Sequence, residues 1–126
     1  MKKTIFAAAA LGAATLSMAA PVMAEGDYKV AMVTDSGDIT DQSFNQTTYE
    51  ACKAFCEENG LDFNYYKPDG DSDEARIASC DQAIADGYNI LVLPGYLFAA
   101  SIVEESPVYP DVKFIALDMS EGDLTG

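Results

Sequence analysis

The stretch YKVAMVTDSGDITDQSFNQTTYE, residues 28–50, decides the fold, because it passes from a buried strand through a polar loop into a helix. Residues 28–34 form a continuous apolar run with β-branched side chains, which is typical of a strand buried on both faces of a parallel sheet. Residues 35–42 are polar and contain a glycine, which predicts a loop. Ser43 and Gln46 then have the spacing of a helix capping box.

The helix that follows is expected to run from Ser43 to Asn59, where Gly60 suits a left-handed cap. Its apolar and small residues recur at helical spacing, which predicts a stripe that packs against the sheet. This predicted stripe consists of Phe44, Thr48, Ala51, Cys52 and Phe55.

The rest of the chain repeats the alternation of strand and helix. A second capping box, Asp71 with Glu74, marks the start of a second helix, and Gly87 stops it. Further strands are predicted at 61–67, 88–93 and 112–117, further helices at 72–86 and 97–105, and a loop at 120–126. Alternating strands and helices with short connections imply an α/β fold: an open parallel sheet with helices on both faces.

The first 24 residues have the pattern of a cleavable signal peptide. Lys2 and Lys3 precede an uncharged run at 5–16, and small or aliphatic residues lead to a cleavage site after Ala24. The apolar run is shorter than the ~20 residues that a membrane-spanning helix needs. A membrane anchor or a buried helix is the alternative. No cysteine lies near the cleavage site, so a lipid-modified N-terminus is not supported, and we expect an exported protein, periplasmic or at the cell surface.

Composition narrows the function of residues 25–126. They carry five basic side chains against 21 acidic ones, a net charge of −16, and such a surface repels nucleic acid. The chain has no histidine, which excludes Ser-His and Cys-His catalytic arrangements. Its three cysteines (Cys52, Cys56 and Cys80) are expected to be buried apolar residues rather than metal ligands.

A ligand of an open parallel sheet binds at the carboxyl ends of the strands. The loop at 35–46 lacks the glycine pattern of a dinucleotide or ATP site, and its three aspartates oppose a phosphate. Phe44 offers a flat apolar face for a ring of the ligand, with Asn45 and carboxylates beside it. The alternative is that Phe44 is a hydrophobic staple of the helix or a core residue. Asp118 ends the last strand, where a carboxylate accepts hydroxyl groups; a cap or turn role is the alternative. Gly95 permits a ligand to approach the backbone closely. Tyr96 either lines the pocket or fills the core.

Three ordered motifs resemble the basic membrane protein family of ABC-transporter substrate-binding proteins, in particular its purine nucleoside receptors. These motifs are TDSGDITDQSFNQ (34–46), ADGYNILVLPGYLFA (85–99) and YPDVKFIALD (109–118). The resemblance implies a type I periplasmic-binding fold of two lobes that close on a ligand, with this chain as an incomplete first lobe at 25–126. It implies a nucleoside as ligand, a membrane permease as partner, and no cofactor, metal or catalysis.

The resemblance also implies roles for single residues. Phe44 would stack on the base, Asp118 would hold the ribose hydroxyls, and Gly95 and Tyr96 would line the pocket. Asp35, Asp41 and Asn45 would be the polar contacts of the first loop.

Two other functions remain open at this point. One is a surface sensor or binding protein for another small molecule, such as a sugar or peptide. The other is an exported nucleoside-processing enzyme, for which Asp38 and Asp41 lack a partner base.

Overall fold

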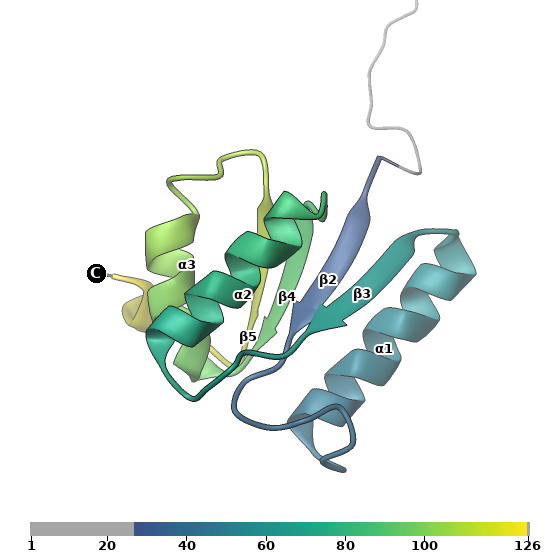
Figure 1. Cartoon of the computed structure of the whole chain (residues 1–126), viewed down its shortest axis with the longest axis horizontal. Helices are drawn as coiled ribbons and strands as arrows, with labels where there is room; N and C mark the ends of the chain where they lie inside the picture. The colour runs from purple at the N-terminus through teal and green to yellow at the C-terminus, as the bar shows by residue number, and fades with distance from the viewer. Residues whose placement is uncertain (1–26, 126) are drawn as a thin grey trace, which may run out of the picture.

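A computed structural model describes residues 27–125 of the chain, and the predicted signal peptide lies outside the described residues. Four parallel strands form one sheet in the order β3-β2-β4-β5 (Figure 1). The strands are β2 (Lys29–Val33), β3 (Asp62–Tyr66), β4 (Ile90–Pro94) and β5 (Lys113–Leu117). The predicted open parallel sheet is therefore confirmed.

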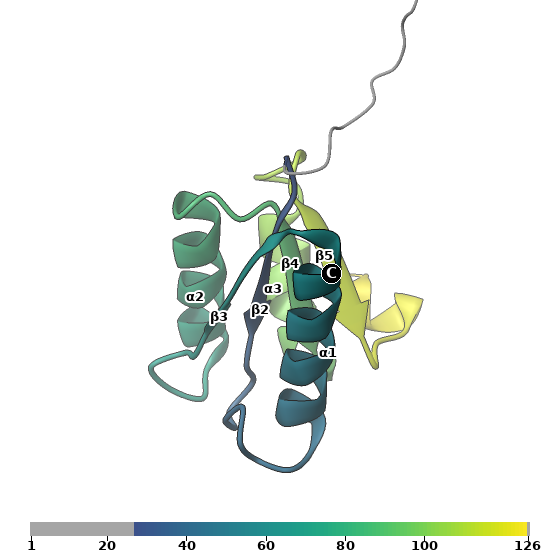
Figure 2. The ribbon, with the colours of Figure 1, turned by 90° about the vertical axis from the view of Figure 1, so that its right-hand side faces the viewer.

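Helices lie on both faces of this sheet, as Figure 2 shows with α1 and α2 on opposite sides. Helix α1 (Phe44–Asn59) covers one face next to β2 and β3. Helices α2 (Asp73–Ala85) and α3 (Ala99–Glu105) contact each other and cover the opposite face. A short 3-10 helix, η3 (Tyr96–Phe98), joins β4 to α3.

The core has two parts, one on each face, because successive side chains of a strand point to opposite sides. On the α2 and α3 side, Val33, Leu91, Leu93 and Phe98 are fully buried. On the α1 side, a smaller cluster is built around Val30, Val92 and Cys56. The central strands β2 and β4 therefore contribute to both halves of the core.

The cysteine prediction holds for two of the three residues. Cys56 and Cys80 are buried, whereas Cys52 is half-buried, and all three are free thiols. Burial raises the pKa of Cys52 to about 11 and that of Cys80 to about 12. Because the thiolate is the reactive form of cysteine, these two thiols are poor nucleophiles at neutral pH.

Both predicted capping boxes are wrong in detail. The side chain of Ser43 makes no capping bond, and Oδ1 of Asp41 instead accepts hydrogen bonds from the backbone N–H groups of Ser43 (2.8 Å) and Gln46 (3.1 Å). At α2 the N-cap is Ser72, whose hydroxyl oxygen accepts a hydrogen bond from the Ala75 N–H, and Asp71 pairs with an arginine instead. Several Asp and Ser residues are adjacent at each helix start, and spacing alone did not select the residue that caps.

Two further expectations are corrected. Residues predicted to be loop form a 3-10 helix, η4 (Glu121–Leu124), which has a capping box between Ser120 and Asp123 and packs its Leu124 on the core. In the predicted stripe of α1 only Thr48 is buried and Cys52 is half-buried. Phe44, the first residue of the helix, is exposed, and so is the pair Ala51 and Phe55, Phe55 with 56% of its surface. These two residues face a part of the sheet that no described helix covers.

Candidate functional site

The carboxyl ends of β2, β4 and β5 bring three of the expected site residues to one edge of the sheet, the lower edge in Figure 1. Asp35, Gly95 and Asp118 each follow one of these strands. The Gly95 N–H donates a hydrogen bond of 3.0 Å to the Leu117 carbonyl, which ties the β4 loop to β5. A Cβ atom built on Gly95 would lie 4.0 Å from Oδ2 of Asp35, so the β2 loop reaches the same place.

Asn45 holds the first loop together. Its side-chain amide donates hydrogen bonds to Oδ1 of Asp35 (2.7 Å) and Oδ2 of Asp41 (2.9 Å), and its own oxygen accepts one from the Asp35 N–H (3.1 Å). Only 2% of Asn45 is exposed. Both amide hydrogens are thus used inside the protein, and the geometry makes Asn45 a residue that positions the loop.

Gly37 is required by the tight packing of this loop. A Cβ atom at this position would lie 2.6 Å from Nδ2 of Asn45 and 3.2 Å from Oδ2 of Asp41. The Gly37 N–H also donates a 2.7 Å hydrogen bond to Oδ1 of Asp35. The loop therefore closes on itself around Asn45, with no space for a larger residue.

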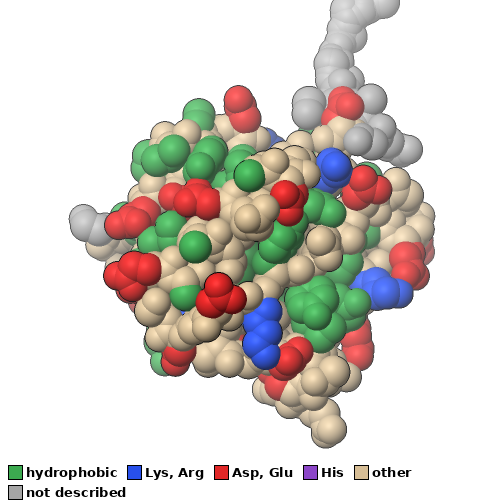
Figure 3. Space-filling model, in the orientation of Figure 1, with side chains coloured by type: hydrophobic (Ala, Val, Ile, Leu, Met, Phe, Trp, Pro, Cys, Tyr) green, Lys and Arg blue, Asp and Glu red, His purple; other side chains and the backbone are tan. Residues whose placement is uncertain are grey.

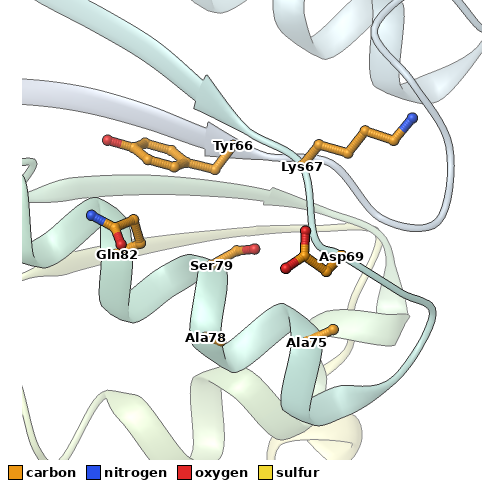
Figure 4. A pocket seen from close by; sticks show the side chains of 7 residues that line it. All are labelled: Tyr66, Lys67, Asp69, Ala75, Ala78, Ser79 and Gln82. Atoms are coloured by element: carbon orange, nitrogen blue, oxygen red, sulfur yellow. The ribbon is translucent and has the colours of Figure 1, made fainter.

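Lys67 anchors the same loop from a neighbouring strand, which the sequence did not predict. Its ammonium lies 2.8 Å from Oδ2 of Asp38, in an ion pair with both side chains about half exposed. Figure 4 shows Lys67 extending away from α2, while Asp69 and Ser79 face the groove beside it. The residue follows β3 directly, and only the sheet order β3-β2 brings it next to the β2 loop.

The carboxylates of the loop are stabilised in their charged form. The hydrogen bond from Lys67 lowers the pKa of Asp38 below its ordinary value, with help from the Ile39 N–H. For Asp41, burial acts to raise the pKa, but hydrogen bonds from Asn45 and from the N–H groups of Gln46 and Ser43 outweigh it and lower the pKa. Both groups are therefore ionised at neutral pH and accept hydrogen bonds.

Two aromatic rings are exposed at this edge. Phe44 is the first residue of α1 and has 38% of its surface exposed, and Tyr96, which begins η3, has 64% exposed. Gly95 precedes Tyr96 with a φ of +114°, a conformation that favours glycine. Both rings therefore lie at the edge where open parallel sheets bind their ligands.

Asp118 adopts a left-handed backbone conformation, with φ of +60°. Gln42, at the end of the β2 loop, has a φ of +54°. In the described residues these are the two non-glycine positions with positive φ, and both lie in loops at the carboxyl edge. Residues held in sparsely populated conformations cluster at functional sites.

Two grooves of the described residues lie on either side of β3. One of about 300 Å³ runs between β3 and α2 (Figure 4), and one of about 340 Å³ lies between α1 and β3. Neither groove is lined by Phe44 or Tyr96. Within residues 27–125 no cluster of three or more residues has the arrangement of a metal site. Over the same residues, no helix is long and apolar enough to span a membrane.

The family model of the PnrA-like ABC-transporter substrate-binding proteins, Bmp, matches residues 28–123. The chain belongs to this family. An uncharacterized lipoprotein of Pyrococcus abyssi is 31% identical, over 76% of this chain and 24% of its own length. The ABC transporter nucleoside-binding protein BmpA of Lactococcus lactis is 25% identical, over 94% of this chain and 37% of its own length.

Solved structures agree with this assignment. A solute-binding protein of an ABC transporter system from Aeropyrum pernix K1 superposes with a TM-score of 0.65 and 28% identity, over 74% of this chain and 25% of that one. A second, from Conexibacter woesei, has a TM-score of 0.57 and 27% identity. The fold is thus that of ABC solute-binding proteins. The chain spans about a quarter of the length of most of these relatives.

Proposed function

We propose that this protein is the extracytoplasmic solute-binding component of an ABC importer and that it binds a nucleoside, with a purine nucleoside favoured. Its partner is then a permease in the membrane, which reads the closure of the binding protein on its ligand. Family membership supports solute binding. The name of BmpA, which states nucleoside binding for that protein, supports the ligand class.

One observation carries the proposal: the exposed rings of Phe44 and Tyr96 lie at the same edge of the sheet as the carboxylates of Asp35 and Asp118. A nucleoside presents the matching chemistry, a flat aromatic base and a sugar with neighbouring hydroxyl groups. An aromatic side chain stacks on any base, because every base has a π-face. A carboxylate accepts hydrogen bonds from sugar hydroxyls. In this proposal Phe44 stacks on the base and Asp118 holds the ribose.

The remaining residues have supporting roles in the proposal. Asp35 presents Oδ2 to the ligand, while its Oδ1 accepts hydrogen bonds from the side-chain amide of Asn45 and the backbone N–H of Gly37. Asp41 and Asn45 fix the shape of the loop, and Gly95 with Tyr96 lines the site. The acidic surface, visible as scattered red groups in Figure 3, fits an uncharged ligand better than a phosphorylated one.

The proposal places the protein outside the cytoplasm, with residues 1–24 removed as a signal peptide and residues 25–126 as the N-terminal part of a first lobe. A site shared between two lobes buries its ligand on both sides, which gives such sites their affinity. One lobe alone is therefore expected to bind weakly.

The test is a calorimetric titration of the protein isolated from its native source with inosine, guanosine, adenosine, uridine and ribose, followed by chromatography of each mixture. We expect binding of at least one purine nucleoside, weaker binding of ribose, and no conversion of the ligand. Binding of a sugar or peptide without any nucleoside binding would favour a receptor or sensor for another small molecule. Release of free base and ribose would make the protein an enzyme.

A further inference from the structure

Strand β3 forms one edge of the sheet (Figure 1), and among residues 27–125 it pairs with β2 alone. An edge strand presents a row of backbone N–H and C=O groups that can pair with another strand. Proteins often block such an edge with a proline or a β-bulge. The sequence of β3, DFNYY, contains no proline, and its register with β2 is unbroken over all five residues. The edge is therefore open to pairing.

Two residues of β3 direct their backbone groups outward. The Thr34 N–H donates a 2.9 Å hydrogen bond to the Tyr66 carbonyl, so the backbone of Tyr66 faces β2. Because successive residues of a strand bond to alternate sides, the N–H and C=O groups of Phe63 and Tyr65 face away from the sheet. In agreement with this, the Tyr65 N–H donates its hydrogen bond of 2.9 Å to the side-chain oxygen of its own neighbour, Asn64. Four backbone groups are thus presented to an incoming strand.

Both faces of the sheet have space beside this edge. On the α1 side, the half-buried rings of Phe63 and Tyr65 contact Tyr49, with ring centroids 5.6 Å and 5.3 Å apart, next to the groove of about 340 Å³. Asn64 points to the opposite face and is exposed. On that face lies the groove of about 300 Å³ between β3 and α2 (Figure 4). A strand added at the edge would therefore find room for its side chains on both faces.

We propose that the partner at this edge is a second copy of the chain, whose β3 pairs antiparallel with the first so that Asn64 faces Asn64 on a two-fold axis. The two sheets then form one continuous sheet. Phe63 lies opposite Tyr65 of the second copy, and because the backbone groups of both residues face outward, they form the hydrogen-bonded pairs of the new ladder. Asn64, whose backbone faces β2, forms the pair without hydrogen bonds at the centre.

The sequence of β3 favours itself as the partner. In this register Phe63 meets Tyr65 twice, and cross-strand aromatic pairs stabilise a sheet. Asp62, the one charged residue of the strand, lies opposite Tyr66 rather than opposite a second carboxylate. The contact is self-complementary and closes on itself, as the interface of a two-fold dimer must. The proposal rests on the edge strand and does not depend on which ligand binds at the carboxyl edge.

Disulfide cross-linking of the protein isolated from its native source, carrying Asn64→Cys, tests the proposal. Facing residues of a pair without hydrogen bonds have Cα atoms about 4.5 Å apart, which is within the reach of a disulfide. Under mild oxidation we expect most of the protein to form a dimer linked through position 64, identified by peptide mass spectrometry and reversed by a reducing agent. The control is Asp62→Cys, exposed on the same strand, whose two copies would lie roughly 14 Å apart and should remain unlinked.

Sedimentation of the protein without cysteine substitutions gives a second readout that does not depend on the folding of Asn64→Cys. We expect a dimer whose dissociation constant rises at least ten-fold in Asn64→Asp, because two like charges then face each other across the axis. The uncharged variant Asn64→Gln should keep the dimer. Equal dissociation constants for these two variants would overturn the proposal.

Two further results would also overturn it. One is a protein that stays monomeric at every concentration, with Asn64→Cys unlinked, as expected if another segment of a longer chain covers the edge. The other is equally efficient cross-linking of Asp62→Cys and Asn64→Cys, which would mean random collision or a different register. Nucleoside titration of the same samples separates these results from the proposed function.

Discussion

Oδ1 of Asp35 accepts a 2.7 Å hydrogen bond from the side-chain amide of Asn45, ten residues further along the chain. The bond joins the end of β2 to the first turn of α1. With the second bond of the amide, to Asp41, it gives the loop one fixed shape before any ligand arrives. Such preorganisation reduces the conformational entropy that binding would otherwise cost.

Replacing Asn45 by alanine is expected to destabilise the protein by about 1–3 kcal/mol, because it removes the three part-buried hydrogen bonds that the Asn45 side chain makes within the loop. Urea unfolding of the variant measures this loss. The control is Asn64→Ala, since the Asn64 side chain is exposed and accepts a hydrogen bond from its own neighbour, Tyr65. Equal losses for the two variants would contradict the role given to Asn45.

Replacing Gly37 by alanine is expected to disrupt the same loop by overpacking, because the added Cβ would lie 2.6 Å from the Asn45 amide nitrogen. We expect a loss of about 1–3 kcal/mol in the free energy of unfolding, together with weaker ligand binding. Gly70→Ala is the matched control, because a Cβ atom there would meet no atom within 4 Å. A Gly37→Ala variant as stable as Gly70→Ala would show that the loop has more space than the structure indicates.

Replacing Asp118 by glycine is expected to separate stability from function. Glycine adopts a positive φ without strain, so the variant should be more stable by about 1 kcal/mol in thermal or urea unfolding. If Asp118 holds sugar hydroxyls, its affinity for a nucleoside should fall at the same time. A variant with lower stability and unchanged affinity would make Asp118 a structural turn residue, which is the alternative reading of its position.

Glu105 makes stability depend on pH. It is 6% exposed at the end of α3, and its Oε2 has no hydrogen-bond partner. Burial, a hydrogen bond with Asp81 and the charges of Asp81 and Glu104 raise the pKa of Glu105 to about 7. An acid whose pKa is raised in the folded state favours folding when it is protonated. Stability should therefore fall as pH rises from about 4.5, the ordinary value, to about 7, by up to about 3 kcal/mol.

Urea unfolding between pH 4 and 8 measures this fall, and Glu105→Gln should remove most of it. Glu58→Gln is the control, because Glu58 is exposed on another helix, α1, and is not one of the groups that raise the pKa of Glu105. Tyr109, which donates a 2.9 Å hydrogen bond to Asp81, does not titrate in this range because Asp81 raises its pKa. The same pH dependence in the Glu105→Gln variant would assign it to another group.

The sequence predicted the open parallel sheet, and with it which loops meet at the carboxyl edge, because both depend on simple patterns. Continuous apolar runs such as 28–34 and short connections define a parallel sheet, and a parallel sheet places Asp35, Gly95 and Asp118 at one edge. Contacts between distant segments were not predictable. The ion pair of Lys67 with Asp38 depends on β3 lying next to β2, and the exposure of Phe55 depends on which strands α1 covers.

The measurement that most directly tests the account is a calorimetric titration of inosine into three forms of the isolated protein: unchanged, Phe44→Ala and Phe55→Ala. The two phenylalanines lie near opposite ends of α1, and only Phe44 is at the carboxyl edge. We predict that Phe44→Ala weakens binding by about 5- to 150-fold, the effect of one lost base stack, and that Phe55→Ala leaves it unchanged. Equal affinities in all three forms, or no binding of any nucleoside to the unchanged protein, would contradict a nucleoside site at this edge.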